Sequence, residues 1–209
     1  MLLDALGEDM ITQALLDAIG QAVESVLNEA RSAAGLILNE ADLKCQLFSR
    51  LAAIPQLRHA MPSSDPGVQA VAVHSEISWF DENGILAFKP DLTVTDPAYL
   101  SIHRSLQPGR TPPSKGVHFV GSSVLLELKF YRGRAGIPRS AVARIRRDME
   151  KLQGLIRTNA ARAPQFQFEG FVVIVSRYAG RPRELDLLIQ GHNDPRVRLV
   201  VECCDVQRQ

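Results

Sequence analysis

The stretch Val124-Leu-Leu-Glu-Leu-Lys-Phe130 is the most informative segment of this 209-residue sequence. Its apolar residues predict a β-strand, in which successive side chains point to opposite faces. Leu125, Glu127 and Lys129 therefore share one face of a strand that is otherwise apolar. Charged groups in such a place are costly unless they pair or bind a metal ion. The alternative is an exposed strand face that carries an ordinary ion pair.

The segment Ile85–Thr95 carries a second anomaly. Pro90 cannot donate a ladder hydrogen bond, so it marks a sheet edge or a local irregularity. Asp91 follows it directly, as a poor strand former among good ones. A Pro-Asp pair on one strand and a Glu-x-Lys on a later strand form a sharper pattern than either alone. If Asp91 is not the relevant acid, Asp96 and Glu76 are the next candidates.

The chain before residue 124 predicts two helices and a hairpin. Apolar residues at three- and four-residue steps predict a helix over 4–34. A second helix is expected over 39–53, with Asn39 as its N-cap. Strands are expected over 69–79 and 85–95, because the Asn-Gly pair between them is typical of a hairpin.

The chain after residue 130 alternates helices and strands. Its apolar patterns predict, in order, a helix over 139–158, a strand over 168–175, a short helix over 183–190 and a strand over 197–203. This order predicts an α/β fold in which a sheet is flanked by helices. The Pro-, Gly- and Arg-rich segment 96–118 is long for a loop and is therefore either functional or mobile.

Bulk composition and charge narrow the function classes. The sequence is 45% hydrophobic and 22% charged, as in ordinary globular proteins. It lacks the ~18-residue apolar run of a membrane span, so we expect a cytoplasmic protein with no membrane partner. Residues 97–162 hold thirteen Lys and Arg against three acids, a balance of +10 in a chain of net charge +1. This clustering indicates either a polyanion-binding surface or a merely solvated one.

Pro90-Asp91 followed by Glu127-Leu128-Lys129 resembles the signature of the PD-(D/E)XK, or restriction-endonuclease-like, nuclease superfamily. The resemblance covers roughly residues 36–176 and implies an αβββαβ core, with a central mixed sheet flanked by helices. On this interpretation the chain is a single domain, with an extra N-terminal helix over 4–34 and a C-terminal extension over 177–209. Thirty-five residues lie between Asp91 and Glu127, which is long for the family; the segment 96–118 accounts for most of them.

The resemblance implies a metal site. Asp91 and Glu127 would bind Mg²⁺ or Mn²⁺ together with the carbonyl of Leu128, and Lys129 would act as a base or as an electrostatic stabiliser. The family often adds an acid from the helix before the sheet, and Glu40 fits because it shares a helical face with the apolar residues Leu36, Leu43, Leu47 and Leu51. Alternatively, Glu40 is only a first-turn acid, favoured by the helix dipole.

The resemblance also implies a nucleic-acid partner, with DNA as the expected substrate. The candidate contacts are basic residues on and before the helix after Lys129: Arg132, Arg134, Arg144, Arg147 and Lys151. The alternative for the helix is a solvated face with an Arg144–Asp148 ion pair. The helix over 4–34 is a candidate homodimer interface, or else covers the sheet. The predicted function is thus a metal-dependent nuclease; the alternative is a nuclease-like domain that no longer cuts and serves as a nucleic-acid-binding or scaffold module.

Overall fold

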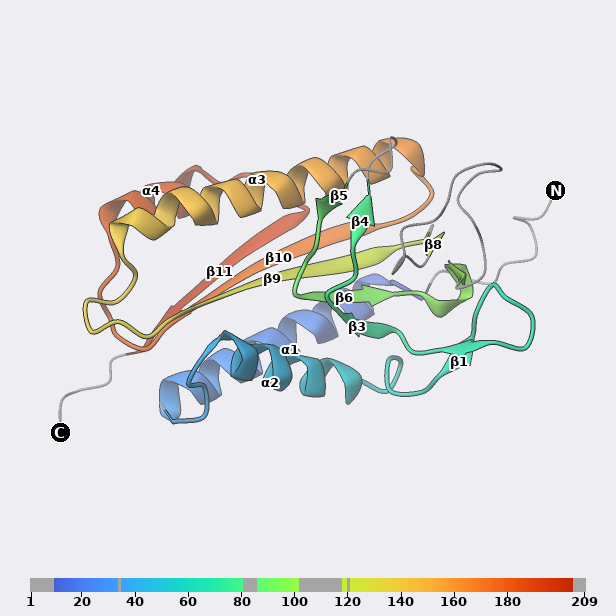
Figure 1. Ribbon diagram of the computed structural model, residues 1–209, viewed down its shortest axis with the longest axis horizontal. Helices are drawn as coiled ribbons and strands as arrows, with labels where there is room; N and C mark the ends of the chain where they lie inside the picture. Colours follow the sequence, from blue (N-terminus) through green and yellow to red (C-terminus); the bar gives the residue numbers. More distant parts are fainter. Residues whose placement is uncertain (1–9, 34, 81–85, 102–117, 120, 205–209) are drawn as a thin grey trace.

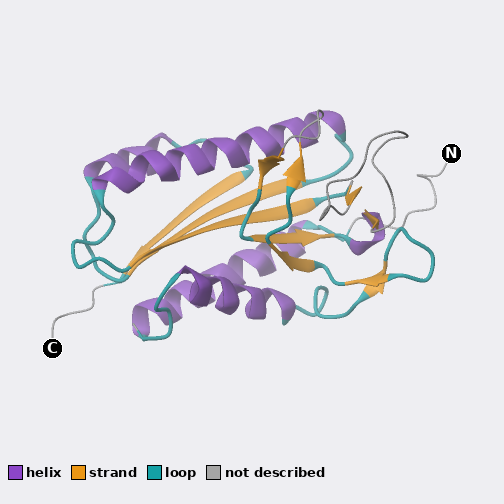
Figure 2. Cartoon of the chain, in the orientation of Figure 1, coloured by secondary structure: helices purple, strands orange, loops and turns teal. Residues whose placement is uncertain are grey.

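The computed structural model describes residues 10–33, 35–80, 86–101, 118–119 and 121–204, which form three layers. A sheet lies between two pairs of helices (Figures 1 and 2). The helices of the described part are α1 (Gln13–Ser32), α2 (Glu40–Ala52), α3 (Arg139–Arg162) and α4 (Arg183–Gly191). The predicted α/β class is confirmed.

The central sheet has five strands in the order β11-β10-β9-β6-β3. Their bounds are β3 (Val73–Ser75), β6 (Leu92–Thr95), β9 (Ser123–Tyr131), β10 (Phe168–Ser176) and β11 (Val197–Cys203). β9, β10 and β11 run parallel, whereas β6 is antiparallel to both β9 and β3. The sheet is therefore mixed, and β11, from the predicted C-terminal extension, is an integral edge strand of it.

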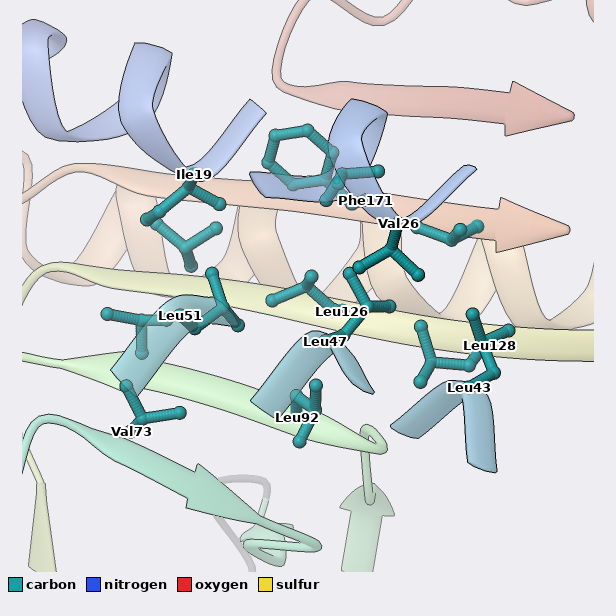
Figure 3. Packing of buried hydrophobic residues seen from close by; sticks show 14 of the residues in the cluster. Ile19, Val26, Leu43, Leu47, Leu51, Val73, Leu92, Leu126, Leu128 and Phe171 are labelled. Carbon is teal, nitrogen blue, oxygen red and sulfur yellow. The ribbon is translucent and has the colours of Figure 1, made fainter. Parts of the chain in front are cut away.

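One face of the sheet is covered by α1 and α2. Ile19 and Val26 of α1, with Leu43, Leu47 and Leu51 of α2, are buried against the sheet (Figure 3). The sheet contributes Val73, Leu92, Leu126, Leu128 and Phe171 to this layer (Figure 3). The apolar stripe of α1 thus covers the sheet of its own chain.

Capping residues determine where these two helices begin. Asn39 accepts a hydrogen bond from the backbone N–H of Asp42, which confirms it as the N-cap of α2. α1 begins at Gln13 because the Thr12 hydroxyl accepts from the N–H of Leu15. The predicted start at residue 4 is wrong for residues 10–12, since the backbone N–H of Met10 instead donates to Asp96. Residues 1–9 lie outside the described part.

The other face of the sheet is covered by α3 and α4. The apolar stripe of α3 packs on Leu125, Val172 and Ile174, and Leu185 of α4 joins the same cluster. Strands 168–176 and 197–203 and the helix 183–191 match their predictions closely. α3 extends four residues beyond the predicted end at 158, and Ala160 of this last turn is partly buried against the same cluster.

The predicted hairpin is interrupted in both of its strands. Its lower part pairs β3 with β6, and its upper part pairs β4 (Trp79–Phe80) with β5 (Leu86–Phe88) in a separate ladder. The upper part, which we call the β4–β5 arm, leaves the sheet and packs against α3 (Figure 1). Residues 76–78 and 89–91 lie at the interruption, so the prediction of two continuous strands is wrong.

The remaining described elements lie at one end of β6. The 3₁₀ turn η1 (Pro97–Tyr99) follows that strand, and two short ladders pair β1 (Met61–Pro62) with β2 (Gln69–Ala70) and β7 (Leu100–Ser101) with β8 (His118–Phe119). Residues 102–117 of the predicted long segment lie outside the described part. None of the described helices has the length and apolarity needed to cross a membrane.

Candidate catalytic and metal centre

The interruption of the hairpin brings Asp91 to Glu127. The last paired residues of β6 and β9 are Leu92 and Leu126. Continuing this register by one step sets Asp91 opposite Glu127, and opposite residues share one face of a sheet. The ladder ends here because the β4–β5 arm turns toward α3. The two acids of the predicted signature therefore meet where β6 separates from β9.

Asp91 replaces a missing part of the ladder with its own side chain. Its Oδ2 accepts a hydrogen bond from the backbone N–H of Leu128 at 2.8 Å. In the same register Leu128 would face Pro90, beyond the last paired residues. The N–H and C=O of a residue in a ladder point to the same neighbouring strand, so the Leu128 carbonyl is also directed toward the Asp91 side.

Glu127 is a buried carboxylate, with 7% of its surface exposed. Burial raises the pKa of Glu127 to about 7, and the charges of Asp91 and Asp148 act in the same direction. The hydrogen bond and charge of Lys129 oppose this shift without cancelling it. Burial, more than the neighbouring charges, is therefore what keeps the pKa of Glu127 high.

Lys129 lies between two carboxylates. Its amine pairs with Oε1 of Glu127 and lies 3.2 Å from Oδ2 of Asp148. Burial alone would lower the pKa of Lys129, but the hydrogen bond and charge of Glu127, with Asp148, raise it above its usual value. Lys129 is thus protonated at neutral pH in this arrangement.

Asp148 is the site residue that sequence reasoning did not assign. It comes from α3, in the layer opposite the helix of Glu40. Its spacing in the sequence does indicate a position facing the sheet. Asp148 lies three residues after Ile145 and four before Leu152, which are both fully buried on the sheet side of α3. The alternative Arg144–Asp148 pair is absent from the described part; Asp148 is paired with Lys129 instead.

The two alternatives to Asp91 have other partners. Asp96 is buried and accepts from the N–H groups of Ala98 and Met10, so it caps η1 and holds the chain before α1. Glu76 is exposed and pairs with Lys44 and Lys89, each at 2.6 Å. These lysines lower the pKa of Glu76 to about 2.

Glu76 also marks the interruption of the hairpin in the backbone. Its φ of 57° is the left-handed conformation that non-glycine residues seldom adopt. Its backbone N–H donates to the carbonyl of Asp91 at 3.1 Å. The hydrogen bond to Glu76 raises the pKa of Lys44, and the charge of Asp91 adds to this shift, so Lys44 lies near Asp91 as well as Glu76. The strained turn therefore positions Asp91 through its backbone.

Glu40 lies at the rim of this site. It is in the first turn of α2, where Leu43, Leu47 and Leu51 are buried, but Glu40 itself and Leu36 are exposed. Glu40 acts on the site through Tyr131, whose pKa is raised mainly by burial and also by the charge of Glu40. Within the described residues, no three His, Cys, Asp or Glu side chains form a group ready to hold a metal ion. The metal-binding role of Glu40 stays a prediction.

The predicted nucleic-acid contacts are accessible. Arg144, Arg147 and Lys151 are exposed on α3, and Arg132 and Arg134 are exposed in the turn before it. Arg144 is close enough to the site for its charge to lower the pKa of Tyr131 against the effect of burial. The structure thus places a basic helix face beside the carboxylates.

Comparison with known proteins adds no relative to this picture. No family model, no curated protein and no solved structure matches the chain.

Proposed function

We propose that the chain is a metal-dependent nuclease of the PD-(D/E)XK type, with a restriction-endonuclease-like core, that hydrolyses phosphodiester bonds of DNA. The observation that carries this proposal is the meeting of Asp91 and buried Glu127 at the end of the β6–β9 ladder, with Lys129 on the same face. These are the three residues of the signature: Glu127 and Lys129 belong to β9, and Asp91 directly precedes β6.

The chemistry of the donor set fits a hard divalent cation. Glu127 and Asp148 both pair with the partly buried ammonium group of Lys129, and the charge of Asp91 acts on Glu127 beside them. Burial is the main cause of the raised pKa of Glu127, and the charges of Asp91 and Asp148 add to it; a bound cation would offset both effects. Mg²⁺ and Mn²⁺ prefer such oxygen ligands. We infer that Asp91, Glu127 and the Leu128 carbonyl would hold the ion, with Glu40 as a further ligand from the rim.

Each residue then has a distinct task. A bound cation would polarise the phosphoryl group and make a neighbouring water more acidic. Asp91 keeps its position through the N–H of Leu128, and Asp148 keeps the amine of Lys129 near Glu127. The raised pKa of Lys129 supports an electrostatic role, in which the protonated amine offsets negative charge on the phosphate.

Cleavage of plasmid and duplex oligonucleotide DNA in the presence of Mg²⁺ or Mn²⁺ tests the proposal. Asp91→Asn, Glu127→Gln and Lys129→Met should each lower the rate by at least about 100-fold, as expected for positioned catalytic groups. Glu150→Gln is the matched control, because Glu150 is an exposed acid on the same helix as Asp148. Metal-dependent cleavage that survives all three substitutions would contradict the site assignment.

A second candidate, a nucleic-acid-binding or scaffold module that does not cut, is favoured by one observation. Glu127 already pairs with Lys129, and one oxygen of Asp91 is already hydrogen-bonded. Titration with Mn²⁺ by calorimetry separates the two candidates. Binding of one ion that Asp91→Ala abolishes supports the nuclease, whereas a wild-type chain that binds no Mn²⁺ supports the module.

A further inference from the structure

Two loops of similar composition lie at the carboxyl ends of neighbouring strands. Residues 132–138 (RGRAGIP) follow β9, and residues 177–182 (RYAGRP) follow β10. Tyr131 and Ser176, the last residues of the two strands, are register partners. We call these two segments, with the first residue of the helix that follows each, the arginine–glycine loop pair.

The two loops contact each other through their backbones. The N–H of Ile137 donates to the carbonyl of Gly180 at 2.8 Å, and the N–H of Arg177 donates to the carbonyl of Tyr131 at 2.9 Å. A Cβ added to Gly136, whose φ is +77°, would lie 1.9 Å from the Gly180 carbonyl oxygen. A Cβ on Gly180 would lie 2.1 Å from the carbonyl oxygen of Ala135. Both glycines are therefore needed for this close approach.

The loop pair concentrates positive charge. Residues 131–139 and 176–183 hold six arginines and no acid. Two of these arginines are paired, Arg139 with Glu184 and Arg181 with Asp186, both acids of α4. Arg132, Arg134 and Arg183 are exposed and form no ion pair in the described part of the chain. These three guanidinium groups come from both loops and are available to an external anion.

The start of α3 adds a second positive feature. A helix N-terminus carries a partial positive charge, which proteins commonly offset with a capping side chain or a first-turn acid. α3 has neither: Pro138 precedes it without a side-chain cap, and the first turn contains Arg139 but no acid. The backbone contribution therefore adds to the arginines and favours an anionic ligand at this place.

This charged surface continues from the candidate catalytic centre. Arg132 follows Lys129 by three residues, roughly 10 Å along an extended strand. This separation is short enough for one DNA strand to contact Lys129 and the loop pair through phosphates close together along the strand.

We propose that the arginine–glycine loop pair binds the phosphate backbone of the DNA that enters the candidate catalytic centre. The identity of the ligand, DNA, rests on the proposed function. The proposal adds a second loop, with Arg183, to the contacts predicted for Arg132 and Arg134; folding brings this loop beside the first one. Guanidinium groups bind phosphate oxygens through paired N–H donors without reading bases. The loop pair therefore determines where the duplex lies rather than which sequence is bound.

The test measures binding without cleavage. A fluorescent duplex of about 20 base pairs is titrated with full-length protein in EDTA, over a series of salt concentrations. Arg134→Ala/Arg183→Ala removes one guanidinium from each loop. The control, Arg58→Ala/Arg157→Ala, removes the same charge from exposed positions, one beyond α2 and one eighteen residues along α3 from Arg139.

We expect the loop variant to bind the duplex about tenfold more weakly than the wild type. The slope of log affinity against log salt should also become shallower by about two, since each phosphate contact contributes about one unit of slope. The control variant should retain the wild-type slope. An unchanged slope in the loop variant, an equal loss in the control, or a wild-type chain that does not bind the duplex would overturn the proposal. Because no cleavage is measured, an inactive chain that binds in this way would refute the nuclease but not the loop pair.

Gly136→Ala provides a second test that leaves the charge unchanged. It should weaken duplex binding because the added Cβ separates the two loops. Thermal unfolding monitors whether the variant remains folded. A folded Gly136→Ala chain with wild-type affinity would contradict the requirement for close approach. Vesicles of anionic lipid provide the comparison: a loss of vesicle binding in the arginine variant with duplex binding unchanged would assign the loop pair to membranes instead of DNA.

Discussion

The carboxylate of Asp91 accepts a hydrogen bond from the backbone N–H of Leu128, at 2.8 Å. The bond forms at the position where β6 no longer pairs with β9, so a side chain completes a sheet that the backbone leaves open. It also directs Asp91 toward the strand that carries Glu127 and Lys129. One residue thus has a structural and a proposed catalytic task, and substitutions should separate the two.

Asp91→Asn should retain the structural task, because an amide oxygen can still accept from Leu128. Asp91→Ala leaves a buried N–H unsatisfied, which costs about 1–3 kcal/mol of unfolding free energy. Urea denaturation should show this loss for Ala and less than about 1 kcal/mol for Asn. Equal destabilisation by both substitutions would mean that the carboxylate charge, and not the hydrogen bond, stabilises this part of the sheet.

Glu127 should make folding stability depend on pH. Its pKa is raised to about 7 in the folded chain by burial, from an ordinary value of about 4.5. The folded state therefore holds the Glu127 proton more tightly than the unfolded state does. This difference adds at most about 3 kcal/mol to the free energy of unfolding below pH 4.5, and the added stability is lost as pH rises toward 7. Glu127→Gln should remove this decrease when unfolding free energies are measured from pH 4.5 to 8. A wild-type profile that the substitution leaves unchanged would contradict the assignment.

Asp148 should act as a positioning residue for Lys129. Asp148→Asn removes one of the two charges that hold the amine, while the pair with Glu127 persists. We expect cleavage to fall about tenfold, against about 100-fold or more for Lys129→Met. The pKa of Lys129, measured by NMR, should also fall in Asp148→Asn but not in Glu150→Gln. A rate equal to that of Lys129→Met would indicate a more direct role for Asp148.

The β4–β5 arm should open before the rest of the chain. Its docking on α3 depends on Trp79 and Phe88, which are both buried in the cluster on that face. Phe88→Ala removes much of this apolar contact, so the arm should detach locally. Trp79 is the single tryptophan of the sequence, and its emission should shift to the red at urea concentrations where circular dichroism is unchanged. Coincident transitions by both probes would show that the arm unfolds only with the whole domain.

Local sequence patterns determined most of the elements. Apolar patterns predicted α2, β9, β10, α4 and β11 within a few residues. The helices bury one face each, whereas β9 and β10 form continuous apolar runs because both of their faces are buried. The alternation along β9 also predicted that Glu127 and Lys129 share a face, and the structure places both on the α3 side. These features depend only on residues adjacent in the chain.

The arrangement around the candidate site was decided by tertiary structure. The hairpin breaks because Trp79 and Phe88 pack on α3 and Glu76 turns the backbone, and neither event has a signature in strand propensity. Asp148 reaches Lys129, and Gly180 meets Gly136, from elements more than fifteen residues away in sequence. Periodicity shows which face of an element is apolar, but the identity of the partner on that face depends on sheet order and helix placement. For that reason the sequence could indicate the three signature residues, whereas only the folded chain shows what surrounds them.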